Sequence, residues 1–472
     1  MSNLPSCSAG EIAALIRRKE VSPVEIARAH LDRIERVNPK LNAFVDYKPE
    51  VVLAQAREAE KALMRGEELG PLHGVPLSIK SSIDVAGQRC EAGTRLRAGH
   101  IATKDAPLVS RLRKAGAVIL GVTNTPELLM AWETDNLLYG RTNNPWDLTR
   151  TAGGSSGGEA AAIAAGLSAG GVGSDGGGSI RVPAHFCGIC GLKPTPGRIP
   201  STGHFPKSGG PFALIGVVGP MARTIEDVRT LFEAMAGWDD GDPSAAPVST
   251  RPIDASFTRA LSIGFFEDDG RTPVTQETRL AVNRTATLLS NCGFRVESFR
   301  PEGLEEARKL WWEYFGIAGG MILEPELRGH ESELSPIMRE FRTWTKSTPS
   351  HTGESLLAAW MGRDEVREKI LLQMRKYPVL ICPTAAIPAF RHGEREWPVG
   401  GKTVGYLDAW SYCEWFNLLG FPAAIVPMGH SNDGLPIGVQ IVGRPWEDEV
   451  VLAVAAKLEA ERGLWQAPPA FQ

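Results

Sequence analysis

The apolar run A-V-I-L-G-V at residues 117–122 constrains the fold of this chain most strongly. Six consecutive residues without a charge predict a strand buried on both faces, as in parallel sheets that helices cover. A helix is predicted at 107–115, where a proline begins it and Gly116 follows it. The alternating segment V-P-L-S-I-K at 75–80 precedes that helix, so the three segments predict a strand–helix–strand unit with parallel strands.

Helices and strands alternate along the rest of the chain. Capping boxes at Ser8 and Ser22 predict two amphipathic helices at the N-terminus. Near the C-terminus, two strands flank the turn signal N-D-G at 432–434, and a helix is predicted at 447–462. The sequence therefore predicts an α/β fold, with one large α/β/α domain whose mixed, mostly parallel central sheet is covered by helices.

Composition suggests four segments within this single domain. We expect N-terminal helices at 1–70, a core at 71–235 and a return to the core at 376–472. The segment 236–375 is rich in tryptophan and phenylalanine, and its start is rich in proline and serine. We interpret it as a variable insertion or cap, whose aromatic side chains serve either packing or the walls of a binding pocket.

Charge and composition exclude several classes of protein. The 51 Lys and Arg and 55 Asp and Glu leave a net charge of -4, and no basic run suggests nucleic-acid binding. No signal peptide is evident, and the small-residue run at 160–173 is too short and glycine-rich to cross a membrane. Seven cysteines without a spacing framework indicate reduced thiols. We therefore expect a soluble, cytoplasmic protein.

Two glycine-rich segments carry the candidate chemistry, T-A-G-G-S-S-G-G-E at 151–159 and G-S-D-G-G-G-S-I-R at 173–181. They contain Ser155 and Ser179, which are 24 positions apart. Lys80 ends the strand at 75–80, and strand alternation turns its side chain away from the apolar face. Lys80 is therefore a plausible base for the two serines.

Short motifs in these segments allow four interpretations. Residues 153–157 match the nucleophile elbow G-x-S-x-G, but no strand precedes them. Residues 171–176 match G-x-G-x-x-G, but neither the apolar helix nor the acidic residue of a dinucleotide site follows. A phosphate loop would need G-K-S or G-K-T where Glu159 follows the glycines. Glycine content alone allows a fourth interpretation, that both segments are merely loops.

Much longer stretches resemble the amidase signature family of serine hydrolases. The run from Gly153 through Arg181 and Pro183 is similar to the family signature. Matching segments precede it, such as G-R-T-N-N-P-W-D, and follow it, such as C-G-I-C-G-L-K-P-T-P-G-R-I and D-G-L-P-I-G-V-Q-I-V-G-R-P. The resemblance covers about residues 8–235 and 376–463, and it implies amide hydrolysis without a metal or cofactor.

The resemblance implies a catalytic triad of Ser179 as the nucleophile, Ser155 as the bridging serine and Lys80 as the base. A lysine accepts a proton only when neutral, so the pKa of Lys80 must lie well below its ordinary value near 10.4, as burial would achieve. The resemblance also implies a cis peptide bond between Gly154 and Ser155.

The backbone N–H groups of Gly176, Gly177, Gly178 and Ser179 are expected to form the oxyanion hole. Many relatives carry threonine where this chain has Gly176, so the change either widens the site or removes a hydroxyl contact. Asp175 is expected to form a buried ion pair rather than to take part in catalysis.

Three further features are interpreted more plainly. Leu129 and Met130 lie in the segment that lines the acyl pocket of relatives, although apolar residues there also suit a core. Cys187 and Cys190 form a lone C-x-x-C without a second pair, which favours small buried residues over a zinc site. We expect Arg181, in the second glycine-rich segment, to be the ion-pair partner of Asp175.

We expect an amidohydrolase that cleaves the C–N bond of a small to medium, mostly apolar amide or anilide, with esters and carbamates as further candidates. The partner is then a small-molecule substrate, with no nucleic acid or membrane, and the protein is a monomer or homodimer. Two alternatives remain. One is the A subunit of a tRNA-dependent amidotransferase, although residues 200–219 lack its A-S-S-x-D-Q-type segment. The other is a non-catalytic binding protein of the same fold.

Overall fold

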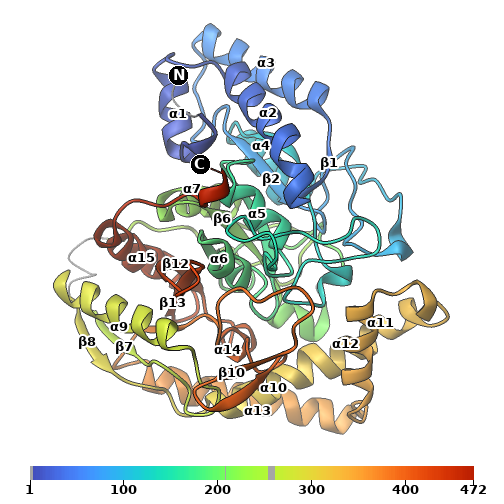
Figure 1. Cartoon of the computed structure of the whole chain (residues 1–472), viewed down its shortest axis with the longest axis vertical. Helices are drawn as coiled ribbons and strands as arrows, with labels where there is room; N and C mark the ends of the chain where they lie inside the picture. The colour runs from blue at the N-terminus through green and yellow to red at the C-terminus, as the bar shows by residue number, and fades with distance from the viewer. Residues whose placement is uncertain (1–3, 208, 254–260, 472) are drawn as a thin grey trace.

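A single mixed sheet forms the centre of the molecule, which we describe from a computed structural model covering residues 4–207, 209–253 and 261–471 (Figure 1). In this part of the chain the sheet has eleven strands in the order β1-β3-β2-β4-β6-β5-β12-β13-β9-β7-β8. The strands are β1 (Phe44–Tyr47), β2 (Pro76–Lys80), β3 (Val118–Thr123), β4 (Gly170–Asp175), β5 (Cys190–Lys193), β6 (Val217–Ala222), β7 (Ser262–Phe265), β8 (Arg295–Ser298), β9 (Val379–Pro383), β12 (Ala423–His430) and β13 (Pro436–Gly443).

The predicted strand–helix–strand unit is confirmed. Strands β2 and β3 pair in parallel, and helix α4 (Pro107–Lys114) connects them. Strand β4 then pairs in parallel with the other edge of β2, where Ile79 lies opposite Val172. The ends of β2 and β4 therefore lie side by side, which brings Lys80 next to the second glycine-rich segment.

The α/β class and the mixed sheet are confirmed, but the predicted predominance of parallel strands is wrong. Within the described residues, six of the ten strand pairs of this sheet are antiparallel. Strands β12 and β13 form a hairpin across a short turn, and β6 runs antiparallel to both β4 and β5. A parallel pair needs a long crossover, which the short turn between β12 and β13 cannot provide.

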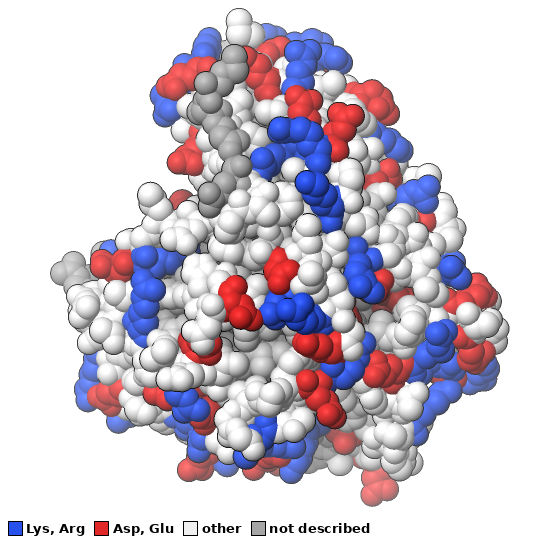
Figure 2. Space-filling view, in the orientation of Figure 1, with Lys and Arg blue, Asp and Glu red and all other residues white. Residues whose placement is uncertain are grey.

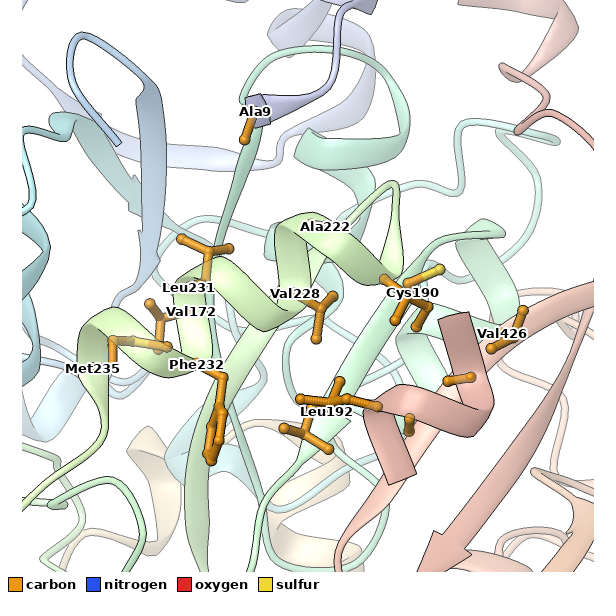
Figure 3. Close-up of a cluster of buried hydrophobic side chains, with 14 of the residues drawn as sticks. Ala9, Val172, Cys190, Leu192, Ala222, Val228, Leu231, Phe232, Met235 and Val426 are labelled. Carbon is orange, nitrogen blue, oxygen red and sulfur yellow. The ribbon is translucent and has the colours of Figure 1, made fainter. Parts of the chain in front are cut away.

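Helices cover both faces of the sheet. The capping boxes predicted at Ser8 and Ser22 are present and begin α1 and α2. Figure 3 shows Leu231 and Phe232 of α7 in a buried apolar cluster that includes Leu192 of β5. The helices of the two layers are α1 (Ala9–Arg17), α2 (Pro23–Leu41), α3 (Pro49–Arg65), α5 (Gly157–Ala164), α6 (Arg181–Cys187), α7 (Ile225–Met235), α9 (Gln276–Asn291) and α15 (Asp448–Arg462).

The segment 236–375 has two structural parts. Its first part adds β7 and β8 to the edge of the sheet beside β9. Its second part forms a helical layer that Figure 1 shows together with α14 on one side of the sheet. This layer comprises α10 (Leu304–Trp312), the π-helical segment η5 (Glu313–Ala318), α11 (Gly319–Leu327), α12 (Pro336–Lys346) and α13 (Gly353–Gln373), and α14 spans Ser411–Leu418.

Charges of both signs are mixed on the surface shown in Figure 2. That face carries no broad basic stripe of the kind that binds nucleic acid. A membrane span requires a long apolar helix, and none of the helices in the described part of the chain meets that requirement.

Candidate active site

Lys80 lies at the centre of a buried cluster of hydroxyl groups. Its Nζ atom donates hydrogen bonds to Ser155 Oγ at 2.7 Å and to Ser174 Oγ at 2.9 Å. The Lys80 side chain is fully buried, whereas Leu77 and Ile79 on the same strand belong to the apolar core. Strand alternation thus turns Lys80 toward the serines, as the sequence predicts.

Burial favours the neutral form of this lysine. It lowers the pKa of Lys80 to about 7, against the opposing charges of Asp175 and Glu159. Glu159, in α5, is also fully buried; burial raises the pKa of its carboxyl group, whereas the hydrogen bonds donated by Ser78 and Thr123 and the charge of Lys80 lower it. The charged forms of Lys80 and Glu159 therefore stabilise each other, and burial opposes both. Because burial is the largest effect on Lys80, this lysine can accept a proton near pH 7.

Ser155 lies in the turn that leads into α5 and is almost fully buried. The Gly154–Ser155 peptide bond is cis, as the resemblance implies. A Cβ atom on Gly154 would lie 2.6 Å from the carbonyl oxygen of Ala131 and 2.7 Å from the backbone of Glu133, so only glycine fits there. This turn holds the Ser155 hydroxyl against Lys80.

Ser179 lies close to Ser155 and faces the same pocket. The N–H of Ser156 donates to the carbonyl oxygen of Ser179 at 3.1 Å, which ties the two glycine-rich segments together. The Ser156 hydroxyl also donates to the carbonyl oxygen of Ser174 and accepts from its N–H, each at 3.3 Å. In the described structure no hydrogen bond joins Ser155 Oγ to Ser179 Oγ, and Ser179 is 9% exposed, the most open of the three residues of the predicted triad.

The glycine loop, residues 176–179, presents backbone N–H groups beside the Ser179 hydroxyl. One of the expected oxyanion donors has another partner, because the Gly178 N–H donates to Asp175 Oδ1 at 2.7 Å. Gly178 is therefore removed from the predicted set. Within the described residues, the N–H groups of Gly176, Gly177 and Ser179 have no hydrogen-bond partner, which leaves them free to hold an oxyanion.

The buried ion pair expected at Asp175 and Arg181 is present. Arg181 donates from Nε to Oδ2 and from Nη2 to Oδ1, each at 3.0 Å, and both side chains are fully buried. Burial alone would raise the pKa of Asp175, but Arg181 and the donated N–H groups outweigh it and hold this pKa below its usual range. The pair fixes the base of the glycine loop.

Aromatic side chains from the helical layer occupy the space beside the glycine loop. A Cβ atom on Gly176 would lie 3.3 Å from the ring of Phe315, and one on Gly177 would lie 2.4 Å from the ring of Trp311. The absence of a threonine side chain at Gly176 therefore does not leave open space, because Phe315 lies against that position.

An apolar pocket begins at Ser179 and extends under the helical layer. Leu129 and Met130 line it, in agreement with their predicted place. A smaller pocket that also borders Ser179 is lined by Trp132, Trp312 and Phe341. Ser155, Ser174, Asp175 and Ser179 form a polar part of the larger pocket, and its further lining residues include Leu128, Phe212, Val217, Val218, Phe315, Ile322, Leu323, Ser201, His204 and Lys207.

Sequence reasoning missed several residues of the site. Ser174 was not singled out, although its hydroxyl is the second partner of Lys80; the parallel pairing of β2 with β4 is the signal that places it there. Glu159 was noted only as an argument against a phosphate loop. Trp132 and Trp311, which donate hydrogen bonds to the glycine loop, carry no sequence signal for this contact.

Cys187 and Cys190 are buried free thiols. In the part of the chain that the structure describes, no group of His, Cys, Asp and Glu side chains could hold a metal ion.

Comparison with known proteins identifies the family. The family model described as "Amidase" matches residues 25–452. The chain belongs to the amidase family. It is 36% identical to an acylamidase of Rhodococcus erythropolis over 466 residues, which covers 98% of this chain and 96% of the relative. It is therefore an amide-hydrolysing enzyme.

Two further relatives of this amidase bear on its function. The A subunit of the glutamyl-tRNA(Gln) amidotransferase of Carboxydothermus hydrogenoformans is 33% identical and is matched over 98% of both chains. The solved structure of a bacterial aryl acylamidase of the amidase signature family has a TM-score of 0.84 and 28% identity, with 96% of each chain covered. Hydrolysis and transamidation thus both occur among its relatives.

Proposed function

We propose that this amidase cleaves the C–N bond of small to medium, mostly apolar amides and anilides through an acyl-enzyme on Ser179. The observation that carries the proposal is the 2.7 Å hydrogen bond from a fully buried Lys80 to Ser155, beside the pocket onto which Ser179 opens. A serine hydroxyl needs a base, and a lysine whose pKa is about 7 is available as one near neutral pH.

Proton transfer follows the chain of hydroxyls. Neutral Lys80 accepts the proton of Ser155, and Ser155 accepts the proton of Ser179 as its Oγ attacks the substrate carbonyl carbon. The developing oxyanion is held by the free N–H groups of the glycine loop. The C–N bond then breaks, and the leaving nitrogen receives the proton back through Ser155. A water molecule, activated by the same relay, hydrolyses the ester on Ser179 and releases the acid.

The lining of the pocket supports an apolar acyl group. Much of its lining is apolar, including Leu128, Met130, Phe212, Phe315 and Leu323, and these side chains offer no partner for a charged group. Ser201, His204 and Lys207 also border the pocket. Esters and carbamates with the same acyl group are further candidates, because the proposed chemistry at Ser179 is common to all of them.

Purified enzyme and its Ser179→Ala variant should be assayed against matched amides, anilides, esters and carbamates. We expect hydrolysis of apolar acyl anilides by the wild-type protein and its loss in the variant, with the folded state unchanged. Hydrolysis by Ser179→Ala at the wild-type rate would contradict the proposal. A wild-type protein that binds these compounds without cleaving them would favour the non-catalytic alternative.

The similarity to part of an amidotransferase supports a second candidate, the A subunit of a tRNA-dependent amidotransferase. That role requires hydrolysis of glutamine, whose polar side chain suits the apolar pocket poorly. Glutaminase activity of the purified protein, or co-purification of partner subunits, would favour this candidate over anilide hydrolysis.

A further inference from the structure

The peptide groups of the glycine loop are held from their carbonyl side. In a trans peptide the C=O and N–H groups point in opposite directions, so a bond to the oxygen also aims the hydrogen. The Asp175 carbonyl accepts from Asn417 Nδ2 at 3.1 Å, and the Gly178 carbonyl accepts from an N–H of α6 at 2.7 Å. These two contacts aim the N–H groups of Gly176 and Ser179.

Two tryptophans hold the peptides in between. Trp311 Nε1 donates to the Gly176 carbonyl at 2.9 Å, which aims the Gly177 N–H, and Trp132 Nε1 donates to the Gly177 carbonyl at 2.9 Å, which aims the Gly178 N–H. The two peptides differ in one respect. The Gly178 N–H already donates to the buried Asp175 carboxylate at the end of β4. Among the described contacts, the Gly177 N–H has no partner.

We propose that Trp311 is a positioning residue for the reaction, whose indole N–H fixes the Gly177 N–H in the oxyanion hole. The inference rests on the proposed function, since it assigns a role within that acyl-transfer step. The Trp311 ring also fills the space at Gly177, where an added Cβ atom would lie 2.4 Å from the ring. Because Gly177 has no side chain, the Trp311 ring fits against it. Within the described residues, the hydrogen bond from the Trp311 indole to the Gly176 carbonyl is the only one that orients the peptide between Gly176 and Gly177.

Trp311 links this loop to the helical layer that covers the pocket. Its ring stacks on Phe315 with centroids 4.7 Å apart and planes 12° from parallel, and Phe315 lines the pocket. The layer that contacts the acyl group therefore also holds an oxyanion donor. Trp311 is 1% exposed, so water cannot take the place of its contact with the loop.

The test compares three tryptophan-to-phenylalanine variants, which keep an aromatic ring and remove the N–H. Among the described contacts, Trp311→Phe removes the sole hydrogen bond that orients the free N–H of Gly177. Trp132→Phe removes one of the two hydrogen bonds that hold the peptide between Gly177 and Gly178. Trp415→Phe is the matched control, because the Trp415 indole is buried without a hydrogen-bond partner in the described structure and lies outside both pockets. Kinetics on an apolar anilide and inhibition by a trifluoromethyl ketone with the same acyl group are measured for each.

We expect Trp311→Phe to lower kcat about 10- to 100-fold, less than the 10²–10³ lost with a whole oxyanion donor, while KM stays unchanged. The inhibition constant of the ketone, whose adduct carries the oxyanion, should rise by the same factor. Trp132→Phe should lower kcat by a smaller factor, and Trp415→Phe should have the kcat of the wild-type enzyme. If Trp311→Phe is unstable, benzothienylalanine at position 311 removes only the N–H and should give the same result.

Three outcomes would overturn the inference. These are a Trp311→Phe variant with wild-type kcat, one that changes KM alone, and a Trp132→Phe variant that loses as much as Trp311→Phe. Failure of the proposed function gives a different pattern, because the ketone would then not inhibit the wild-type protein and Ser179→Ala would keep its activity.

Discussion

Replacing Glu159 by glutamine is predicted to move the pH profile of this amidase toward lower pH. In the wild-type protein, burial lowers the pKa of Lys80 from 10.5 to about 7. A lowering of that size corresponds to about 5 kcal/mol of bias against the ammonium form. At pH 7 about half of the molecules then hold a neutral base, against about one in 3000 for an unperturbed lysine.

The sign of the shift follows from the charge of Glu159. Its negative form raises the pKa of Lys80 and so opposes the effect of burial. Ser78 donates to Oε1 of Glu159 and Thr123 donates to Oε2. Glutamine keeps the size of the side chain, its carbonyl oxygen accepts from one of these hydroxyls and its NH2 group donates to the oxygen of the other, but it cannot carry the charge. The pKa of Lys80 should therefore fall below its wild-type value, and more base is neutral at acidic pH.

The assay is kcat/KM for an apolar anilide between about pH 5 and pH 9. For the wild-type enzyme it should rise about tenfold per pH unit up to about pH 7 and then level off, because the base must be neutral. For Glu159→Gln, the inflection of the kcat/KM profile should lie at a lower pH than for the wild-type enzyme. Glu414→Gln is the control, because Glu414 is also buried but faces Arg308 instead. An inflection of Glu159→Gln that stays in place or rises would refute the reasoning.

Three further variants test other parts of the site. Asp175→Asn leaves its arginine partner as an uncompensated buried charge and should destabilise the fold by about 3–5 kcal/mol; an unchanged midpoint in guanidinium denaturation would contradict this. Gly177→Ala should lower the free energy of unfolding by about 1–3 kcal/mol and also lower kcat, because its Cβ would lie 2.4 Å from Trp311. Gly353→Ala is the control and should change neither quantity, because no atom lies within 4 Å of the Cβ at that position. Leu323→Ala should enlarge the pocket and raise kcat/KM for longer acyl chains relative to shorter ones by about tenfold, and an unchanged ratio would place the acyl group elsewhere.

Local pattern was enough to predict the part of the site that depends on local structure. Strand alternation predicted that Lys80 turns out of the core, and the family resemblance implied that it lies with Ser155 and Ser179, although Lys80 and Ser155 are 75 positions apart. The Asp175–Arg181 pair is local, since the two residues are six positions apart. For this pair the residues that determine the geometry lie within the motif itself.

Contacts between distant segments could not be predicted in the same way. Trp311 meets Gly176 across 135 positions of the chain, and the helical layer determines that contact.

Gly178 was wrongly placed among the oxyanion donors because the motif does not reveal that Asp175 takes its N–H. The strand directions were misjudged for a related reason, since a buried apolar strand looks alike in parallel and antiparallel sheets.

Covalent trapping determines which serine is the nucleophile, a role that we propose for Ser179. A fluorophosphonate reacts with an activated serine, and mass spectrometry of the digested protein locates the adduct. We expect one adduct, on Ser179, formed more slowly when Lys80 is replaced by methionine. An adduct on Ser155, or labelling of the Ser179→Ala variant at the wild-type rate, would rule out Ser179 as the nucleophile.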